Sequence, residues 1–490
     1  MEPSRLKGQV FPRHRRWGLP AGPFCFLLLL VLPWGEGLPW PARCVLATTI
    51  WMAVWWTTEA VHLAVTALVP IPLFPLLGVA PAGEVTASYA DQVIYLYVGG
   101  FLIAAAMERW KVHRRLALLT IQLTGVGARR LLLGFMGATA ALSMWISNTA
   151  TAMMMLPIVL AVLSRIEEDG GRDRGQAGAS LGRALTLGVA YAASIGGIAT
   201  LVGTPPNAVF AGVLEQTLQR TVSFWDWLEF AFPVSLAMFG VAWVYLAFFV
   251  LDEASLRLDL GMQAIREELR GMGPWRREEK WVLGVFGCVA AAWILRGLVP
   301  LPERLGGVQD STIAMVGALA LFLIPSSWKK GEFLLDWKTA VQRIPWDIVL
   351  LFGGGFALAH GFYQSGLTRW IGERMTGLSV LGPWLLMAVA IVLVILLTEV
   401  TSNTATASII LPIAAGLGDV VQVPPEHLMA TITVAASLAF MLPVATPPNA
   451  IAFSTRRVTI PEMARAGLAV DGVGVLVLLL FARFWLPWVW

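Results

Sequence analysis

Charged residues are scarce in this sequence of 490 residues. Only 13% of the residues are charged, whereas 57% are hydrophobic, and an ordinary soluble domain carries about 25% charged residues. A soluble protein this apolar could not cover its surface with polar side chains, so we expect the lipid bilayer to be its solvent. The composition therefore predicts a polytopic membrane protein.

Cysteine pairs, histidine clusters and nucleotide-binding motifs are also missing. The three cysteines, Cys25, Cys44 and Cys288, have neither the number nor the spacing of a disulfide framework or a metal site. The five histidines form no H-E-x-x-H pair, and G-x-x-x-x-G-K-[ST] does not occur, so the chain encodes no nucleotide-driven pump. The formal net charge of +4 reports topology in a membrane protein rather than a nucleic-acid partner, and we expect none.

The basic residues give the expected orientation. Residues 1–21 form a basic tail, and the apolar run near 24–32 is expected to be a retained first helix. If the chain starts inside and alternates across the membrane, most of its 35 basic residues fall in loops on one side, as the positive-inside rule requires. We therefore expect a multi-pass protein of the cell membrane, a bacterial inner membrane, with a cytoplasmic N-terminus and a cytoplasmic linker at 251–280.

Two apolar segments have an unusual length. Residues 131–163 contain 33 residues without a charge, too many for one span and too few for two of about 20 residues each. The sequence Ser-Asn-Thr stands at its midpoint (147–149), and 386–418 carries the same tripeptide at 402–404. Irregular backbone at membrane depth is tolerated only where it is buried in protein or lines a cavity. Both segments are therefore predicted to be re-entrant helical hairpins.

The two halves of the chain repeat each other. The stretch SNTATAMMMLPI from Ser147 aligns with SNTATASIILPI from Ser402, and nine of these twelve positions are identical. A second pair follows, TPPNA at 204–208 and at 446–450. By helix count, the first hairpin enters the membrane from the inside and the second from the outside. The repeats are then inverted, an arrangement typical of secondary transporters.

Each TPPN motif lies within an apolar segment, 184–213 in the first half and 426–453 in the second. Two consecutive prolines remove backbone donors and clash with the preceding turn, so each helix is expected to break there. Free carbonyl and hydroxyl oxygens without a carboxylate suit Na⁺, and the N-termini of half-helices suit an anion. Neither hairpin contains Lys or Arg, so bound cations should offset the desolvation cost of a dianion. We expect two cation sites flanking one anion site.

The expected fold is an all-α polytopic membrane protein. It comprises two inverted repeats, 22–250 and 281–490, with about 11 transmembrane helices in addition to the two re-entrant hairpins.

The doubled SNT, the doubled TPPN and the stretch WWTTEA at 55–60 resemble the divalent anion/Na⁺ symporter family, which includes sodium-coupled dicarboxylate, citrate and sulfate transporters. The resemblance runs from about Trp51 to the C-terminus. It implies a homodimer that works as an elevator, in which a scaffold domain holds the dimer interface and a transport domain carries both hairpins.

The resemblance also assigns roles to residues. It implies a first Na⁺ site at Ser143, Ser147, Asn148 and the carbonyl of Gly203. It implies a second Na⁺ site at Thr398, the carbonyl of Thr401, Asn403 and the carbonyl of Ala445. The substrate carboxylates are expected at Asn148, Thr149, Thr204, Asn403, Thr404, Thr446 and Pro447.

Six acidic residues lie in or beside apolar segments, where a carboxylate is a functional candidate. Five of them are expected at helix ends: Glu59, Asp91, Asp310, Asp347 and Asp471. The sixth, Glu399, stands three residues before Ser402 and could tune the second cation site or relay a proton. Its counterpart in the first half is Met144, so Glu399 is not part of the repeated machinery.

Together these features predict a sodium-driven symporter for C4-dicarboxylates such as succinate, malate or fumarate, and not an enzyme. Three alternatives stay open on the sequence. The same fold could exchange dicarboxylates without Na⁺, it could carry citrate or sulfate, or the chain could be an anion channel.

Overall fold

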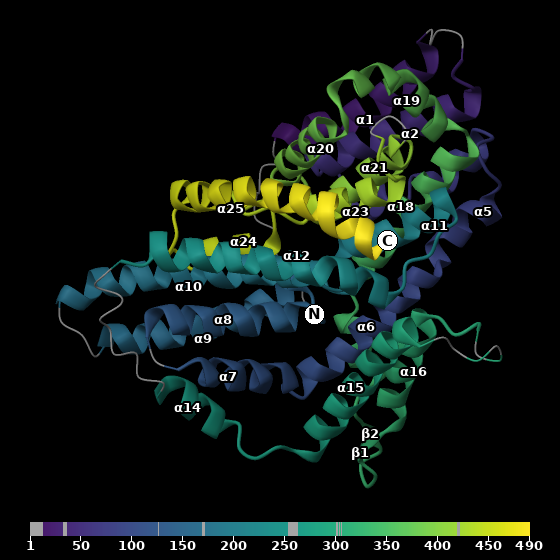
Figure 1. Cartoon of the computed structure of the whole chain (residues 1–490). Helices are drawn as coiled ribbons and strands as arrows, with labels where there is room; N and C mark the ends of the chain where they lie inside the picture. Colours follow the sequence, from purple (N-terminus) through teal and green to yellow (C-terminus); the bar gives the residue numbers. More distant parts are fainter. Residues whose placement is uncertain are drawn as a thin grey trace.

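Helices make up almost the whole molecule in the computed structural model (Figure 1), which describes residues 13–32, 37–125, 127–168, 172–252, 263–299, 302, 304, 306–418 and 422–490. The one exception among these residues is a short antiparallel hairpin of β1 (Pro325–Ser327) and β2 (Glu332–Phe333). Nothing in the sequence pattern predicted this hairpin.

The first two helices, α1 (Arg13–Val31) and α2 (Trp40–Thr58), pack along each other. Helix α1 begins at Arg13, so it extends beyond the apolar run near 24–32 into the segment 1–21. Glycines explain the close packing, because a Cβ on Gly18 would stand 2.0 Å from Thr58 Oγ1 and one on Gly22 would stand 2.6 Å from the Trp51 ring. Arg15 also forms an ion pair with Glu59 at the end of α2, which ties the first turn of α1 to the body of the protein.

The chain then forms short helices before a long one. These are α3 (Leu63–Thr66), α4 (Pro70–Leu76), α5 (Ala82–Ala87), η1 (Ser88–Ala90), α6 (Gln92–Arg109) and α7 (Val112–Thr124). Pro70 and Pro75 lie in α4. Proline is tolerated at the start of a helix but interrupts its interior, which accounts for several short helices in the apolar segment 62–79 rather than one continuous helix.

The segment expected to be the first hairpin consists of two helices, α8 (Ala128–Ser143) and α9 (Asn148–Glu168), joined by a short turn. Next come α10 (Arg172–Ile198) and α11 (Pro205–Leu218). The break between α10 and α11 falls directly before Pro205, as the missing backbone donors require. In Figure 1, α8, α9, α10 and the following α12 (Phe224–Tyr245) run side by side.

The middle of the chain continues from η2 (Leu246–Val250), a single π-helical turn, to α14 (Gln263–Gly271), α15 (Arg277–Leu298), α16 (Asp310–Leu323) and α17 (Trp337–Arg343). Helix α14 lies in the linker predicted at 251–280, and it packs against α7 and α9. Residues 253–262 of that linker lie outside the described residues.

The second half has the same order of elements as the first. Helix α18 (Trp346–Gln364) leads to α19 (Leu367–Met375), η4 (Thr376–Leu381), α20 (Pro383–Thr398) and α21 (Asn403–Ala415). Then follow α23 (Pro425–Ala435), α24 (Pro447–Ser454), α25 (Ile460–Leu480), η5 (Phe481–Trp485) and α26 (Leu486–Val489). Helices α20 and α21 meet at the second SNT, and the break between α23 and α24 falls before the second Pro-Pro.

The glycines at 353–355 illustrate how tightly α18 is packed. A Cβ on Gly353 would lie 2.1 Å from the Tyr89 ring, and one on Gly354 would lie 2.5 Å from the carbonyl oxygen of Ala67. Small residues at such contacts let helices approach closely in membranes.

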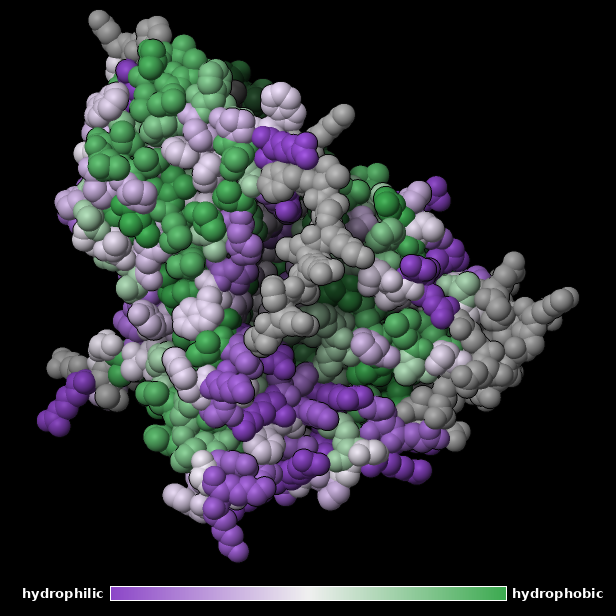
Figure 2. All heavy atoms as spheres, turned by 180° about the vertical axis from the view of Figure 1, so that it is seen from behind, coloured by the Kyte–Doolittle hydropathy of each residue, from purple (hydrophilic) through white to green (hydrophobic). Residues whose placement is uncertain are grey.

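Six helical stretches among the described residues are long and apolar enough to cross a bilayer: 82–109, 178–198, 224–250, 277–298, 346–364 and 460–489. Five further apolar helices are shorter, among them both arms of the second hairpin and the second arm of the first. Exposed hydrophobic side chains are numerous, and Figure 2 shows them spread over one face while hydrophilic side chains gather towards its lower edge. An all-helical membrane protein with several apolar spans accounts for this surface.

Candidate functional site

The tip of the first hairpin joins α8 to α9 through a cluster of oxygen atoms. Ser143 Oγ lies 2.8 Å from Asn148 Oδ1 and 2.6 Å from the carbonyl oxygen of Ala193 in α10. A hydroxyl has one proton, so it donates to one of these acceptors and faces the other with a lone pair. The Ser147 hydroxyl accepts from the backbone N–H of Ala150 at 3.3 Å. These oxygens suit a cation without any carboxylate.

The tip of the second hairpin is built in the same way. Thr398 Oγ1 lies 2.8 Å from Asn403 Oδ1 and 2.8 Å from the carbonyl oxygen of Ala436, which follows α23. The side chain of Thr401 turns towards Thr406, 2.6 Å away, and its hydroxyl also donates to the carbonyl oxygen of Leu397. The Thr401 side chain is thus occupied elsewhere, which leaves its carbonyl as the group that the expected second Na⁺ site requires.

The two helix breaks are held by the asparagines of the TPPN motifs. Asn207 Nδ2 donates to the carbonyls of Gly197, Ile198 and Thr200, at 2.7–3.2 Å. Asn449 Nδ2 donates to the carbonyls of Ala439 and Leu442, at 3.0 and 3.1 Å. Both asparagines are fully buried. Neither asparagine was among the residues expected at the site, although their repetition within an apolar segment was the signal for a role.

Both tips and both breaks meet at one cavity of about 700 Å³. All seven residues expected to hold substrate line it: Asn148, Thr149, Thr204, Asn403, Thr404, Thr446 and Pro447. The residues of the expected cation sites divide into two groups. Five of them line the cavity: Ser147, Asn148, Thr401, Asn403 and Ala445. The other three, Ser143, Gly203 and Thr398, are buried behind it.

Four helix N-termini reach the cavity. Asn148 is the first residue of α9, Thr204 precedes α11, Asn403 is the first residue of α21 and Thr446 precedes α24. The first N–H groups of a helix lack partners within the helix, and the helix dipole is positive there. Four such ends around one cavity favour an anion without a formal positive charge.

Formal charge at the cavity is acidic. Among the described residues that line it there is no Lys or Arg, while Glu59 and Asp347 are present together with His14. The end of α2, from Trp56 to Glu59, forms one wall. This wall carries the WWTTEA stretch, to which the resemblance had assigned no binding role, and spacing alone could not place it opposite the hairpins.

Four of the acidic residues expected at helix ends are found there. Glu59 caps the C-terminus of α2, Asp91 caps the N-terminus of α6, and Asp310 and Asp347 lie in the first turns of α16 and α18. The expectation is wrong for Asp471, which lies in the middle of α25 and is 2% exposed. The hydrophobic pattern around it marked a helix but gave no sign of what that face of the helix contacts.

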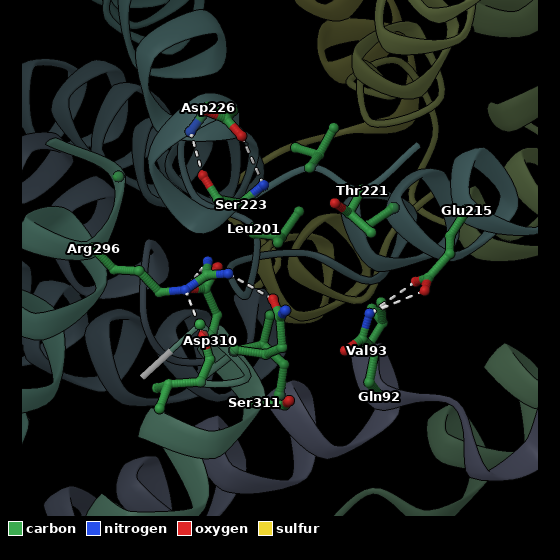
Figure 3. Close-up of a pocket in the computed structure, with 17 residues that line it drawn as sticks. Gln92, Val93, Leu201, Glu215, Thr221, Ser223, Asp226, Arg296, Asp310 and Ser311 are labelled. Carbon is green, nitrogen blue, oxygen red and sulfur yellow. Dashed lines mark hydrogen bonds and ion pairs between the residues drawn. The ribbon is translucent and has the colours of Figure 1, made fainter. Parts of the chain in front are cut away.

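A second cavity, of about 420 Å³, lies between α6, α11, α12 and the pair α15–α16 (Figure 3). Its polar groups are already paired: Arg296 Nη1 lies 2.9 Å from Asp310 Oδ1, and Gln92 Nε2 donates to both oxygens of Glu215, at 3.0 and 3.1 Å. None of the residues expected to bind Na⁺ or substrate lines it. The sequence motifs therefore converge on the larger cavity alone.

A largely helical bundle with a polar cavity between broken helices and hairpin tips defines a secondary membrane transporter. Comparison with known proteins specifies the class further. Residues 13–490 match the family described as "Sodium:sulfate symporter transmembrane region", and the chain belongs to this family. The resemblance found in the sequence is thereby confirmed, and the family is one of transporters rather than enzymes.

A curated relative agrees with this assignment, and two solved structures share the fold. The chain is 40% identical over 484 residues to the sodium-dependent dicarboxylate transporter SdcS of Staphylococcus aureus strain NCTC 8325, covering 98% of this chain and 93% of that protein. The fold is similar to that of the YdaH transporter of Alcanivorax borkumensis, with a TM-score of 0.57, 15% identity and coverage of 83% and 87%. It is also similar to MtrF of Neisseria gonorrhoeae, with a TM-score of 0.57, 12% identity and coverage of 94% and 97%.

Proposed function

We propose that this protein is a sodium-coupled symporter of C4-dicarboxylates such as succinate, malate or fumarate. The observation that carries the proposal is the cavity in which four helix N-termini and two hydroxyl–amide clusters meet, with no Lys or Arg among the described residues that line it. Its volume of about 700 Å³ is within the usual range for small-molecule sites. The similarity to a sodium-dependent dicarboxylate transporter, at 40% identity over nearly the full length, supports the same substrate class.

In this proposal, Na⁺ and the dicarboxylate bind next to one another at each hairpin tip. Asn148 and Asn403 each offer an amide oxygen to a cation and an N–H₂ group to a substrate carboxylate. One Na⁺ would lie among Ser143, Ser147, Asn148 and the Gly203 carbonyl, and the other among Thr398, Asn403 and the carbonyls of Thr401 and Ala445. Burying the dianion without the cations would leave its charge uncompensated, and this cost couples the two fluxes.

The movement we propose is an elevator within a homodimer of inverted repeats. The hairpins α8–α9 and α20–α21 would travel with the broken helices they contact, while the remaining helices hold the dimer. His14, Glu59 and Asp347 line the cavity. We place the N-terminus on the inside, as the basic loops predict.

The rival functions differ in what they need from the hairpin tips. A sodium-independent exchanger has no use for hydroxyl and amide oxygens gathered away from the substrate groups, yet both tips retain them. An anion channel would pass substrate without saturation and without accumulation. Citrate or sulfate would fit the same machinery, so competition must decide between these anions and C4-dicarboxylates.

The test is uptake of labelled succinate into proteoliposomes under an imposed Na⁺ gradient. We expect accumulation against the succinate gradient that collapses when K⁺ replaces Na⁺, with malate and fumarate as effective competitors. Uptake that ignores Na⁺ but needs internal dicarboxylate would show an exchanger. Stronger competition by citrate or sulfate than by malate would reassign the substrate.

A further inference from the structure

Two buried carboxyl groups lie behind the tip of the second hairpin, and neither belongs to the proposed sites. Glu399, the residue after α20, is 2% exposed and accepts hydrogen bonds from the backbone N–H groups of Met441 and Leu442, at 2.8 and 2.9 Å. Asp471 of α25 is also 2% exposed, and its carboxyl lies within hydrogen-bonding reach of Glu399.

The close approach of α25 brings the two carboxyls together. A Cβ on Gly467 would stand 2.4 Å from the carbonyl oxygen of Phe440 and 2.4 Å from the nitrogen of Met441. Only a glycine allows the helix to lie this close to the irregular segment between α23 and α24. Asp471 follows one turn later on the same face of the helix, so its side chain is carried to the place where Glu399 enters from the other side.

The two carboxyls are not equally satisfied. Glu399 accepts from two backbone N–H groups, whereas the one backbone donor beside Asp471, that of Phe440, leaves both oxygens of Asp471 without a well-formed hydrogen bond among the described residues. The groups that act on Asp471 are the Glu399 carboxyl and the backbone at Phe440. Two sets of acceptor oxygens thus face each other inside an apolar bundle, and an unpaired carboxylate there is costly.

A third oxygen lies nearby without a partner. Tyr191 of α10 is fully buried, its hydroxyl has no hydrogen-bond partner among the described residues, and it is within electrostatic reach of both Asp471 and Glu399. Its ring packs on Phe440, with 5.0 Å between the ring centroids. Because Phe440 also contacts α25 at Gly467, the side chains of Tyr191, Glu399 and Asp471 bring oxygen atoms from three separate helical segments into the same buried region.

We propose that Glu399, Asp471 and the Tyr191 hydroxyl form a third Na⁺ site, which is occupied and emptied during transport. A hard cation prefers oxygen ligands that include carboxylates. A bound cation would also offset the repulsion between two carboxyl groups that can only accept. The inference rests on the proposed symport, which it deepens, because the ion would be an additional coupling ion rather than a fixed part of the fold.

The first half lacks this arrangement. The counterpart of Glu399 is Met144, and Ser235 stands twelve residues after the capping Ser223 of α12, as Asp471 does after the capping Thr459 of α25. Ser235 donates to the carbonyl of Ile195 at 2.7 Å, so that position is satisfied without an ion. The third site would therefore be asymmetric, present beside one hairpin tip and absent beside the other.

The decisive experiment measures the number of Na⁺ ions moved per succinate. In proteoliposomes with a fixed succinate gradient and a clamped membrane potential, the Na⁺ gradient of zero net flux gives this number. We expect Asp471→Asn to lower it by one relative to the unaltered protein. The control is Glu215→Gln, which makes the same oxygen-to-amide exchange at a carboxyl of the second cavity (Figure 3) and should leave the number unchanged.

Tyr191→Phe provides a graded test. Loss of one neutral ligand should raise the Na⁺ concentration for half-maximal uptake about fivefold, on the scale of one lost hydrogen-bonding oxygen, while the number of ions stays the same. An unchanged ion number in Asp471→Asn would overturn the proposal. If Asp471→Asn keeps the number of Na⁺ ions per succinate but abolishes the pH dependence of uptake, the carboxyl pair holds a proton instead of Na⁺. That result also overturns the proposal.

A second measurement covers the case in which Asp471→Asn does not transport. Purified protein without substrate can be titrated with NaCl, at constant ionic strength with choline chloride, while its melting temperature is followed. The slope of the melting temperature against the logarithm of the Na⁺ concentration reports the number of bound Na⁺ ions. A slope lower by one ion in Asp471→Asn than in the unaltered protein supports the site, and an unchanged slope overturns it. If the unaltered protein shows no sodium-dependent uptake at all, the proposed symport fails, which is a different result.

Discussion

The two hairpin tips of this protein use the same polar chemistry but have different surroundings. In each, a hydroxyl lies 2.8 Å from an asparagine side-chain oxygen and close to a carbonyl of the neighbouring helix break: Ser143 and Asn148 in the first, Thr398 and Asn403 in the second. Behind the second tip lie two buried carboxyls, whereas Met144 and Ser235 occupy the matching positions behind the first. Duplication thus explains the shared part, and later divergence of the halves explains what is added.

The comparison also shows which parts of a repeat can change. Backbone carbonyls released by a helix break depend on the break and not on a particular side chain, so Gly203 in one half can match Ala445 in the other. Side chains that fill the space behind the break are free to differ, because the break itself is held by Asn207 and Asn449.

The largest effects are expected for the two asparagines. Asn148→Ala and Asn403→Ala should each reduce sodium-dependent succinate uptake by at least about 100-fold, since each removes a cation ligand and a substrate donor. Gln364→Ala, an exposed amide at the end of α18, serves as the matched control. Size-exclusion chromatography in detergent establishes that the variants fold. Normal uptake in only one of the two variants would break the functional symmetry of the tips.

A smaller effect should separate the halves at a glycine. A Cβ on Gly197 would lie 2.4 Å from Asn148 Oδ1, so Gly197→Ala should displace that side chain and reduce uptake by roughly 5- to 100-fold, as overpacking costs about 1–3 kcal/mol. The repeat counterpart is Ala439, where Ala439→Gly removes a methyl group and should have less than a tenth of that effect. Equal losses in the two variants would contradict this account of the first tip.

The hydroxyls should matter less than the asparagines. Ser143→Ala and Thr398→Val each remove one neutral oxygen ligand and should raise the Na⁺ concentration for half-maximal uptake about 10-fold, or about 1.4 kcal/mol. Ser143→Thr and Thr398→Ser keep the oxygen and are the controls. The Na⁺ dependence of uptake at saturating succinate is the measurement, and a Na⁺ response unaltered in the hydroxyl-free variants would remove these residues from the sites.

The smallest effect is expected at the capping boxes, where the halves agree most closely. Ser223 pairs with Asp226 at the start of α12, and Thr459 pairs with Glu462 at the start of α25. Ser223→Ala and Thr459→Ala should each lower the free energy of unfolding by about 1 kcal/mol with no change in Na⁺ dependence. Thermal denaturation in detergent, with Ser223→Thr and Thr459→Ser for comparison, tests this. A shift in Na⁺ dependence would show that the caps also position the tips.

Much of the candidate site was predictable because its residues lie at the ends of helices. Pro-Pro at 205–206 and 447–448 forces a helix break, and an uncharged segment of 33 residues forces a turn at its midpoint. The polar residues at these breaks and turns lie on irregular backbone, which at membrane depth must be buried in protein or line a cavity. All seven residues expected to hold substrate therefore line one cavity.

Contacts between distant helices were not predictable in this way. The WWTTEA stretch belonged to the family pattern, yet its place opposite the hairpins depends on how α2 packs. The start of α1 was not predicted because the contacts of Gly18 and Gly22 with α2 are not visible in the sequence. The basic residues of that segment had favoured a tail. Asp471 was expected at a helix end because a lone carboxylate in an apolar segment costs least there.

The sequence by itself determined the solvent of this protein, its duplication, its helix breaks and the residues at its hairpin tips. These follow from composition and from local rules: charge is costly in a bilayer, and proline cannot continue a helix. Only the tertiary structure decided that four helix N-termini meet at one cavity and that Glu399 faces Asp471. Such contacts depend on how closely two helices approach. Gly467 permits the close approach, but a glycine in the sequence does not show which helix will lie against it.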